Sequence, residues 1–245
     1  MATVETTTHD LPGPAGPIRI RRLAPRGGAP KLPVIIAWSD IFQQTPSHQR
    51  TIERIASHGF RVLSPEHYCR LLPPGTVLDF ERDRDLALKT AGQLELSWID
   101  DDREAILAYA EEEAAGAPLG TIGWCFGGHL ALRAALSPRI RAAVGCYATG
   151  LHNDSLGAAQ GTASTLARAK ELSAAPLLIW GSKDPHIPAE GRAKISAALI
   201  AAGISPEVLV LEGEHAFMRD EGPRYDPAAT DAAFAAILDY FRRRL

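Results

Sequence analysis

Short runs of apolar and β-branched residues recur along this chain, and longer stretches with helical spacing separate them. Most of the short runs are continuously apolar, which is typical of strands buried on both faces of a parallel sheet. The runs are residues 18–23, 34–38, 60–63, 121–123, 142–147, 177–180 and 207–211. Strands that alternate with helices predict an α/β fold with a mostly parallel, doubly wound sheet and helices on both faces.

The stretches with helical spacing are residues 99–115, 127–136, 189–202 and 231–245. The first strand, 18–23, alternates in polarity, so we expect an exposed edge strand there. Residues 1–17 are rich in Thr, Pro and Gly and are expected to form a flexible segment. A length of 245 residues suits one large α/β domain, which we place at 18–245.

Charge and cysteine content narrow the class of protein. The formal net charge is -3, whereas a dedicated nucleic-acid binder is normally basic. The three cysteines, Cys69, Cys125 and Cys146, are too few for a disulfide framework and indicate a reducing compartment. The first residues lack the pattern of a signal peptide, and no apolar run approaches the roughly 20 residues that span a bilayer. We expect a cytoplasmic monomer or weak homo-oligomer that binds neither nucleic acid nor membrane.

The sequence Gly-Trp-Cys-Phe-Gly-Gly at 123–128 carries the strongest chemical signal. It follows a predicted strand and precedes an Ala/Leu-rich helix, which is the context of a nucleophile elbow. Such a turn holds its central side chain above the sheet, and flanking glycines relieve its crowding. The Phe126 N–H would then lie at a helix N-terminus, where it can bind a developing oxyanion. Cys125 is the candidate nucleophile; the alternative is a small buried residue in a glycine-rich turn.

A cysteine nucleophile needs a base and a group that orients this base. Asp184 follows the 177–180 strand and His215 follows the 207–211 strand. Because catalytic groups of doubly wound sheets gather at the carboxyl ends of strands, we expect both beside Cys125. The chain order of nucleophile, acid and histidine is that of α/β-hydrolases. Two alternatives stay open: Asp184 as a turn or cap residue, and His186 as the base.

The sequence contains no motif for binding zinc, a nucleotide phosphate or a dinucleotide. The remaining histidines show no ligand spacing with cysteines or carboxylates, so a zinc site is not expected. The phosphate-binding pattern G-x-x-x-x-G-K-[ST] and the dinucleotide fingerprint G-x-G-x-x-G do not occur. We expect chemistry that uses neither a metal nor a cofactor.

Taken together, the motifs resemble the dienelactone hydrolase family (carboxymethylenebutenolidase-like), a branch of the α/β-hydrolase fold with a cysteine nucleophile. The resemblance covers about residues 18–245. It rests on the elbow at 123–128, on Gly-x-x-Asp at 181–184 with Pro188 after it, and on His-Ala-Phe-Met-Arg at 215–219. It extends to Trp-Ser-Asp-Ile-Phe at 38–42 and to Pro-Glu-His-Tyr at 65–68.

The resemblance implies a role in the reaction for five residues. Cys125 would be the nucleophile and His215 the base and later the acid. Asp184 would orient His215. The backbone N–H groups of Ile41 and Phe126 would form the oxyanion hole.

It also implies residues that adjust the nucleophile or bind substrate. Asp40 stands where the family has a glutamate that contacts the resting cysteine. Arg219 and Arg84 match arginines that hold a substrate carboxylate, with Arg82 as a competing match for the second. Trp124, beside the nucleophile, is a further candidate for substrate binding.

Three features depart from the family's pattern. Asp40 is one methylene shorter than glutamate, and Leu88 and Ala91 occupy positions where aromatic residues are expected. The stretch 149–163 is longer than the usual connection and is a candidate lid. Residues 81–85 alternate in charge, so a solvated helix start is the alternative for both arginines there.

The predicted activity is hydrolysis of a small-molecule activated ester or enol lactone, dienelactone-like and carboxylated, through a cysteinyl thioester. A broader carboxylesterase or thioesterase is the alternative among enzymes. A non-catalytic ligand-binding protein on the same scaffold is the alternative outside them.

Overall fold

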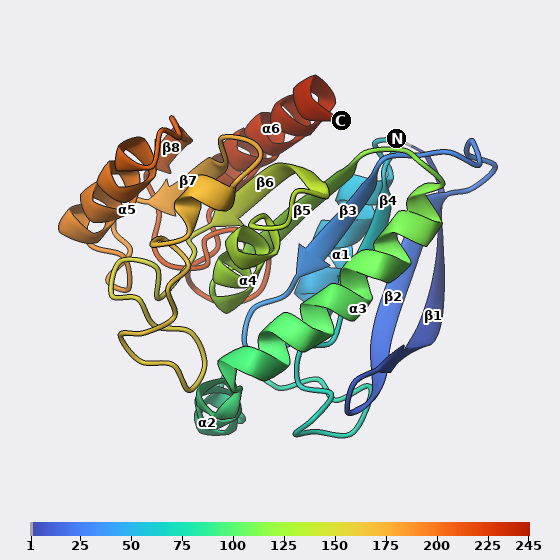
Figure 1. The fold of residues 1–245 in the computed structure, drawn as a ribbon, viewed down its shortest axis with the longest axis horizontal. Coiled ribbons are helices and arrows are strands. Elements are labelled where there is room, and N and C mark those ends of the chain that lie inside the picture. The colour runs from blue at the N-terminus through green and yellow to red at the C-terminus, as the bar shows by residue number, and fades with distance from the viewer. Residues whose placement is uncertain (1) are drawn as a thin grey trace.

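One mixed sheet of eight strands forms the centre of the molecule (Figure 1). The structure is a computed structural model that describes residues 2–245. The strand order is β1-β2-β4-β3-β5-β6-β7-β8, and the pairs from β4 to β8 are parallel. The strands are β1 (Val4–Gly13), β2 (Gly16–Pro25), β3 (Val34–Trp38), β4 (Arg61–Pro65), β5 (Leu119–Trp124), β6 (Ile140–Cys146), β7 (Leu177–Gly181) and β8 (Glu207–Leu211).

Helices cover both faces of this sheet (Figure 1). They are α1 (Pro46–Ala56), α2 (Arg84–Gln93), α3 (Leu96–Ala114), α4 (Phe126–Ala134), α5 (Ala189–Ala201) and α6 (Pro227–Arg244), with a short 3-10 helix η1 (Ala169–Glu171). In the view of Figure 1, α3 and α4 lie in front of the sheet, and α1 and α6 lie behind it. The predicted doubly wound α/β architecture is confirmed.

The parallel strands are buried because helices cover both of their faces. Every residue of β3, β4, β5 and β7 is buried, which matches their continuous apolar sequences. At the sheet edge, β8 alternates, and Val208 and Val210 are exposed. Within residues 2–245, no helix has the length and apolar composition needed to cross a bilayer.

The N-terminal region differs from the sequence prediction. Residues 4–13, expected to be flexible, form β1 and pair antiparallel with β2 along its whole length. The predicted edge strand therefore lies between β1 and β4, and the prediction of an edge at 18–23 was wrong. Backbone pairing stabilises β1, since its side chains are largely exposed and give little apolar signal.

Helix α1 was not predicted, whereas the start of α2 at Arg84 agrees with the alternative of a helix start at 81–85. In α1, Pro46 occupies the first turn and the Thr45 hydroxyl accepts the His48 N–H, so local capping defines the start. Helix α2 buries only Ala87, Thr90 and Ala91, so its sequence shows a weak apolar stripe.

The parallel order brings four strand ends to one edge of the sheet. The loops after β3, β5, β7 and β8 all leave from carboxyl ends, where sites of doubly wound sheets form. These loops carry Asp40 and Ile41, Cys125, Asp184, and His215 in turn.

Candidate active site

Cys125 lies in a strained turn between β5 and α4. Its backbone has φ 56° and ψ -120°, a conformation that non-glycine residues rarely adopt. A Cβ on Gly123 would lie 1.9 Å from the Gly127 carbonyl oxygen, and one on Gly127 would lie 2.2 Å from the carbonyl oxygens of Trp38 and Ser39. These two positions therefore require glycine. The turn has the geometry of a nucleophile elbow.

Asp184 and His215 meet at the ends of β7 and β8. The Asp184 Oδ2 atom lies 2.7 Å from His215 Nδ1, and Asp184 Oδ1 accepts the His186 N–H at 2.8 Å. Both residues are buried, with exposed fractions of 3% and 5%. A buried carboxylate on Nδ1 fixes the ring orientation and leaves Nε2 for the reacting groups.

The electrostatic state of His215 follows from these neighbours. Burial alone would lower the pKa of His215. Negative charge at Cys125, together with the Asp184 carboxylate and ring contacts with both side chains, outweighs burial and raises the pKa to about 10. A negative charge at Cys125 thus favours the imidazolium form of His215.

His186, the alternative base, lies beside this pair without replacing His215. Its ring is edge-on to the His215 ring, with 4.6 Å between centroids. Burial and the neighbouring His215 lower the pKa of His186. His186 contacts the Asp184 carboxylate through its backbone N–H. Asp184 therefore orients the ring of His215 but not the ring of His186.

Ile41 and Phe126 lie on the cavity that contains Cys125 and His215. Phe126 is the first residue of α4, and first-turn N–H groups have no acceptor within their own helix. The helix N-terminus adds positive electrostatic potential there. The two residues expected to supply the oxyanion hole are thus brought together beside the cysteine.

The cavity has a volume of about 350 Å³ and a mixed lining. Arg84, Arg219 and Arg224 contribute to its wall, as do Leu88 and Ala91 from α2. Arg82 does not line it: this side chain is 77% exposed and pairs with Asp83 at 2.8 Å. The structure therefore brings Arg84, and not Arg82, to the site.

Asp40 and Arg219 form an ion pair beside the cavity. Arg219 Nη2 donates to Asp40 Oδ2 at 2.7 Å, and its guanidinium lies 3.9 Å from the Phe80 ring centroid and 5.2 Å from that of Phe42. The other oxygen of Asp40 accepts the Phe42 N–H at 2.9 Å. Both carboxylate oxygens of Asp40 are thus engaged by groups other than Cys125.

Trp124 points away from the cavity. Its side chain is buried and packs edge-on against His48 of α1, with 5.4 Å between ring centroids. The residues that line the cavity include its neighbours Cys125 and Phe126 but not Trp124. The sharp turn at Cys125 directs adjacent side chains to different sides of the sheet edge.

The loop after β6 forms the outer side of the cavity. Residues Thr149, Gly150, Ser155, Leu156, Gly157 and Gln160 line it. The Ala158 N–H donates to the Leu94 carbonyl at 2.8 Å, so this loop lies against the end of α2, as Figure 1 shows in yellow and green. The stretch predicted as a candidate lid is thus a wall of the cavity in this structure.

Two buried side chains of α4 hold this loop. Arg133 binds both Asp100 carboxylate oxygens at 2.7 and 2.6 Å and donates to the Ala163 carbonyl at 2.7 Å. His129 contacts the Thr149 carbonyl and the Thr165 hydroxyl at 3.1 and 2.8 Å. Burial lowers the pKa of His129 to about 3, so the neutral ring donates to the carbonyl and accepts from the hydroxyl.

Sequence reasoning missed Arg224, Gln160 and Leu156 as cavity residues. All three lie in irregular segments after β6 and β8. Their approach to Cys125 depends on the path of those segments, which no periodic pattern encodes.

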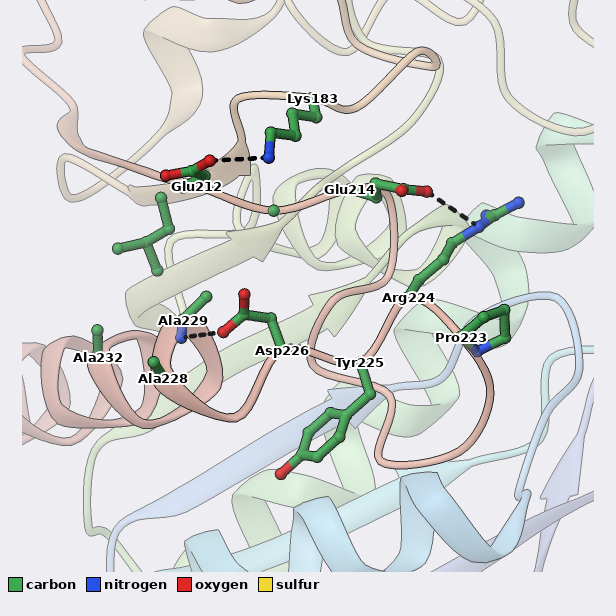
Figure 2. Close-up of a pocket in the computed structure, with 12 residues that line it drawn as sticks. Lys183, Glu212, Glu214, Pro223, Arg224, Tyr225, Asp226, Ala228, Ala229 and Ala232 are labelled. Carbon is green, nitrogen blue, oxygen red and sulfur yellow. Dashed lines mark hydrogen bonds and ion pairs between the residues drawn. The ribbon is translucent and has the colours of Figure 1, made fainter.

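A second hollow, of about 490 Å³, lies beside the loop after β8 (Figure 2) and shares Arg224 with the cavity at Cys125. Its charged groups satisfy one another: Lys183 pairs with Glu212 at 2.7 Å, and Arg224 with Glu214 at 3.7 Å. Asp226 caps α6 by accepting the Ala229 N–H at 2.9 Å. Among residues 2–245, the lining of this hollow contains no cysteine, serine or histidine, in contrast to the cavity at Cys125.

Comparison with known proteins assigns the chain to a family. The model of the dienelactone hydrolase family matches residues 21–245. The chain belongs to the dienelactone hydrolase family. A Saccharomyces cerevisiae relative named "Putative carboxymethylenebutenolidase" is 31% identical over 253 residues, covering 99% of this chain and 93% of the relative. The Pseudomonas putida carboxymethylenebutenolidase is 28% identical over 211 residues, covering 85% and 84%.

A solved structure of this family has the same fold. The crystal structure of a "Putative Dienelactone Hydrolase" from Klebsiella pneumoniae subsp. pneumoniae MGH 78578 matches with a TM-score of 0.83 at 23% identity, covering 98% of this chain and 99% of that one. The α/β-hydrolase fold predicted from the sequence is confirmed. As a member of the dienelactone hydrolase family, the chain is a carboxylic ester hydrolase.

Proposed function

We propose that this enzyme hydrolyses a carboxylated, activated ester or enol lactone of the dienelactone type through a cysteinyl thioester. The observation that carries the proposal is the strained turn at Cys125, placed on one cavity with His215, which Asp184 holds at 2.7 Å. The names of the yeast and Pseudomonas relatives support the substrate class.

In the first half of the reaction, the Cys125 thiolate attacks the substrate carbonyl. The carbonyl oxygen becomes an oxyanion that accepts hydrogen bonds from the Ile41 and Phe126 N–H groups. The intermediate collapses with cleavage of the carbon–oxygen bond. The leaving enolate takes a proton from the His215 imidazolium, and the acyl group stays on Cys125 as a thioester.

In the second half, water releases the acid. Acylation removes the negative charge from Cys125, which is one of the causes that raise the pKa of His215. Neutral His215 then takes a proton from water, the hydroxide attacks the thioester, and the thiolate leaves. The change of charge on Cys125 thus converts His215 from acid to base between the two steps.

The cysteine favours an activated substrate. A thiolate is a good nucleophile and also a good leaving group, so a tetrahedral intermediate from an alkyl ester expels Cys125 again. An enolate competes well with the thiolate as a leaving group. Enol lactones are therefore the substrates that this nucleophile suits.

A carboxylate on the substrate suits the charge of the wall. Arg84 has no carboxylate within ion-pair distance in the part of the chain that the structure describes, whereas Arg219 is paired with Asp40. Arg84 is thus free to bind a substrate carboxylate, with Arg219 as its second contact once Asp40 shares the guanidinium.

A broader carboxylesterase is the second candidate. The apolar side chains on the cavity, Ile41, Phe42, Leu88, Phe126 and Leu156, favour it because they can accept neutral esters. Equal kcat/KM for carboxylated and neutral esters would support this candidate.

The cytoplasmic location and the monomeric or weakly oligomeric state of the protein stay predictions.

The decisive experiment compares hydrolysis of a carboxylated dienelactone by wild type and by Cys125→Ala, with Cys69→Ala as the matched control. Cys69 is half-buried, and burial and Asp102 raise the pKa of its thiol to about 12, so its loss leaves turnover intact. We expect Cys125→Ala to abolish turnover and wild type to show an acyl adduct on Cys125 by intact-protein mass spectrometry. Turnover by Cys125→Ala at the wild-type rate would refute the mechanism.

A further inference from the structure

The turn after β3 contains a backbone N–H that has no hydrogen-bond acceptor within the described residues. Residues 40–43 form this turn, closed by the Gln43 N–H, which donates to the Asp40 carbonyl at 3.1 Å. In such a turn, the N–H of the second residue takes no part in the closing hydrogen bond. The second residue is Ile41, which lines the cavity with Cys125. The orientation of the Ile41 N–H therefore depends on how this turn is held.

The Asp40 carboxylate holds one end of the peptide group between Ile41 and Phe42. Its Oδ1 accepts the Phe42 N–H at 2.9 Å, two residues along the chain, in the ring that Asp and Asn side chains form with their own backbone. Glutamate is one methylene longer and does not favour this ring. The shorter residue at position 40 is therefore matched to the turn.

Tyr68 holds the other end of the same peptide group. Its hydroxyl donates to the Ile41 carbonyl at 3.0 Å. The side chain is 1% exposed and packs edge-on against His67, with 4.4 Å between ring centroids. Burial, with the negative charges of Asp40 and Cys125, raises the pKa of Tyr68 well above its usual value. The hydroxyl therefore keeps its proton and remains a donor.

We infer that Asp40 and Tyr68 are positioning residues that fix the turn at 40–43 and thereby aim the Ile41 N–H at the oxyanion. Because a peptide group is planar, hydrogen bonds on its two opposite edges fix the orientation of the Ile41–Phe42 group. The Ile41 N–H belongs to the preceding Asp40–Ile41 group, whose carbonyl accepts the Gln43 N–H. With the groups on both sides of Ile41 held, the direction of its N–H is determined. The inference rests on the proposed function, in which the Ile41 N–H donates a hydrogen bond to the oxyanion. It assigns Asp40 a task different from contact with the resting cysteine.

Arg219 connects this turn to the substrate side of the cavity. It donates to Asp40 at 2.7 Å and lies over the Phe42 ring, so it touches the residues on both sides of Ile41. Without Arg219, Asp40 keeps a half-buried negative charge that has lost its partner. Loss of Arg219 is therefore expected to reduce kcat for a neutral ester as well as affinity for a carboxylated one.

Steady-state kinetics on a dienelactone and on its methyl ester test the inference. Asp40→Ala removes the acceptor for the Phe42 N–H, and Tyr68→Phe removes the donor to the Ile41 carbonyl. A misaligned oxyanion donor costs roughly tenfold to hundredfold in kcat. We therefore expect kcat of both variants to fall by this factor on both substrates, while KM changes little. Asp40→Asn keeps an oxygen for the Phe42 N–H and retains most of kcat for the methyl ester; Asp40→Glu does not. Wild-type kcat in both Asp40→Ala and Tyr68→Phe would overturn the inference.

Alkylation of Cys125 by iodoacetamide separates positioning of the oxyanion site from an effect on the cysteine. This reaction forms no oxyanion, so its rate in Asp40→Ala stays at the wild-type value. An alkylation rate that falls in parallel with kcat would assign Asp40 to the cysteine and overturn the inference.

Tyr68→Phe removes a single oxygen, and an unchanged thermal midpoint confirms that this variant folds. If Cys125→Ala is inactive while both turn variants keep wild-type kcat, this inference alone fails; if Cys125→Ala stays active, the proposed function fails.

Discussion

The two sides of the cavity are built in different ways. The catalytic wall, formed by the loops after β3, β5, β7 and β8, is mostly buried and follows directly from strand ends, with Asp184 3% and His215 5% exposed. The outer wall, formed by α2 and residues 149–160, includes Leu88, which is 49% exposed. In the outer wall, the loop is held to α4 through Arg133 and to the end of α2 through the Leu94 carbonyl. The difference indicates that reaction class is determined by the sheet and substrate choice by peripheral segments.

The largest expected effect lies in the catalytic wall. Asp184→Asn removes the charge that orients His215 and stabilises its imidazolium, so kcat should fall by roughly 10²–10⁴. The matched control is Asp226→Asn in the second hollow, where the amide oxygen still accepts the Ala229 N–H and caps α6. Both variants should keep the wild-type thermal midpoint within a few degrees. A wild-type kcat in Asp184→Asn would remove Asp184 from the mechanism.

The pKa of His215 tests whether the catalytic wall works as one charged unit. Cys125→Ala removes one of the causes that raise this pKa, so it should fall from about 10 toward the usual value of 6.5. Titration of the ring signals by NMR measures the change. His129 is an internal control because burial, which Cys125 does not affect, lowers its pKa to about 3 in both proteins. An unchanged His215 titration would mean that Cys125 carries no charge that His215 senses.

The outer wall should lose its attachment when Arg133 is changed. Arg133→Met leaves Asp100 without this partner and frees the Ala163 carbonyl, and breaking a buried pair costs about 3 kcal/mol in the free energy of unfolding. Urea unfolding measures the loss. Arg168→Met is the matched control, since its pair with Glu171 is exposed and contributes little to the free energy of unfolding. Equal losses in the two variants would contradict the anchoring role of Arg133.

The same division explains what the sequence could predict. The catalytic wall was predictable because apolar strands fix where each turn leaves the sheet. Cys125, Asp184 and His215 could be placed from the glycine-flanked turn at 123–128, the strand ends and the chain order together. The full extent of α2 and the particular residues of the 149–163 loop that line the cavity were not predictable, because their positions depend on tertiary contacts such as the one between Ala158 and Leu94. The strand β1 was missed for a related reason: backbone pairing with β2 defines it, and its side chains carry no periodic signal.

The smallest expected effect concerns the charge of the outer wall. Arg84→Met removes a guanidinium at the cavity, and a charge-assisted hydrogen bond to a substrate carboxylate is worth about 1.5 kcal/mol, or roughly tenfold in kcat/KM. Arg82→Met is the matched control because Arg82 has the same charge two residues earlier but pairs with Asp83 away from the cavity. For a carboxylated lactone, we expect kcat/KM to fall in the first variant only. For its methyl ester, neither variant should change kcat/KM. A tenfold loss on the methyl ester in Arg84→Met would mean that α2 shapes the cavity sterically, and carboxylate selection would then rest on Arg219.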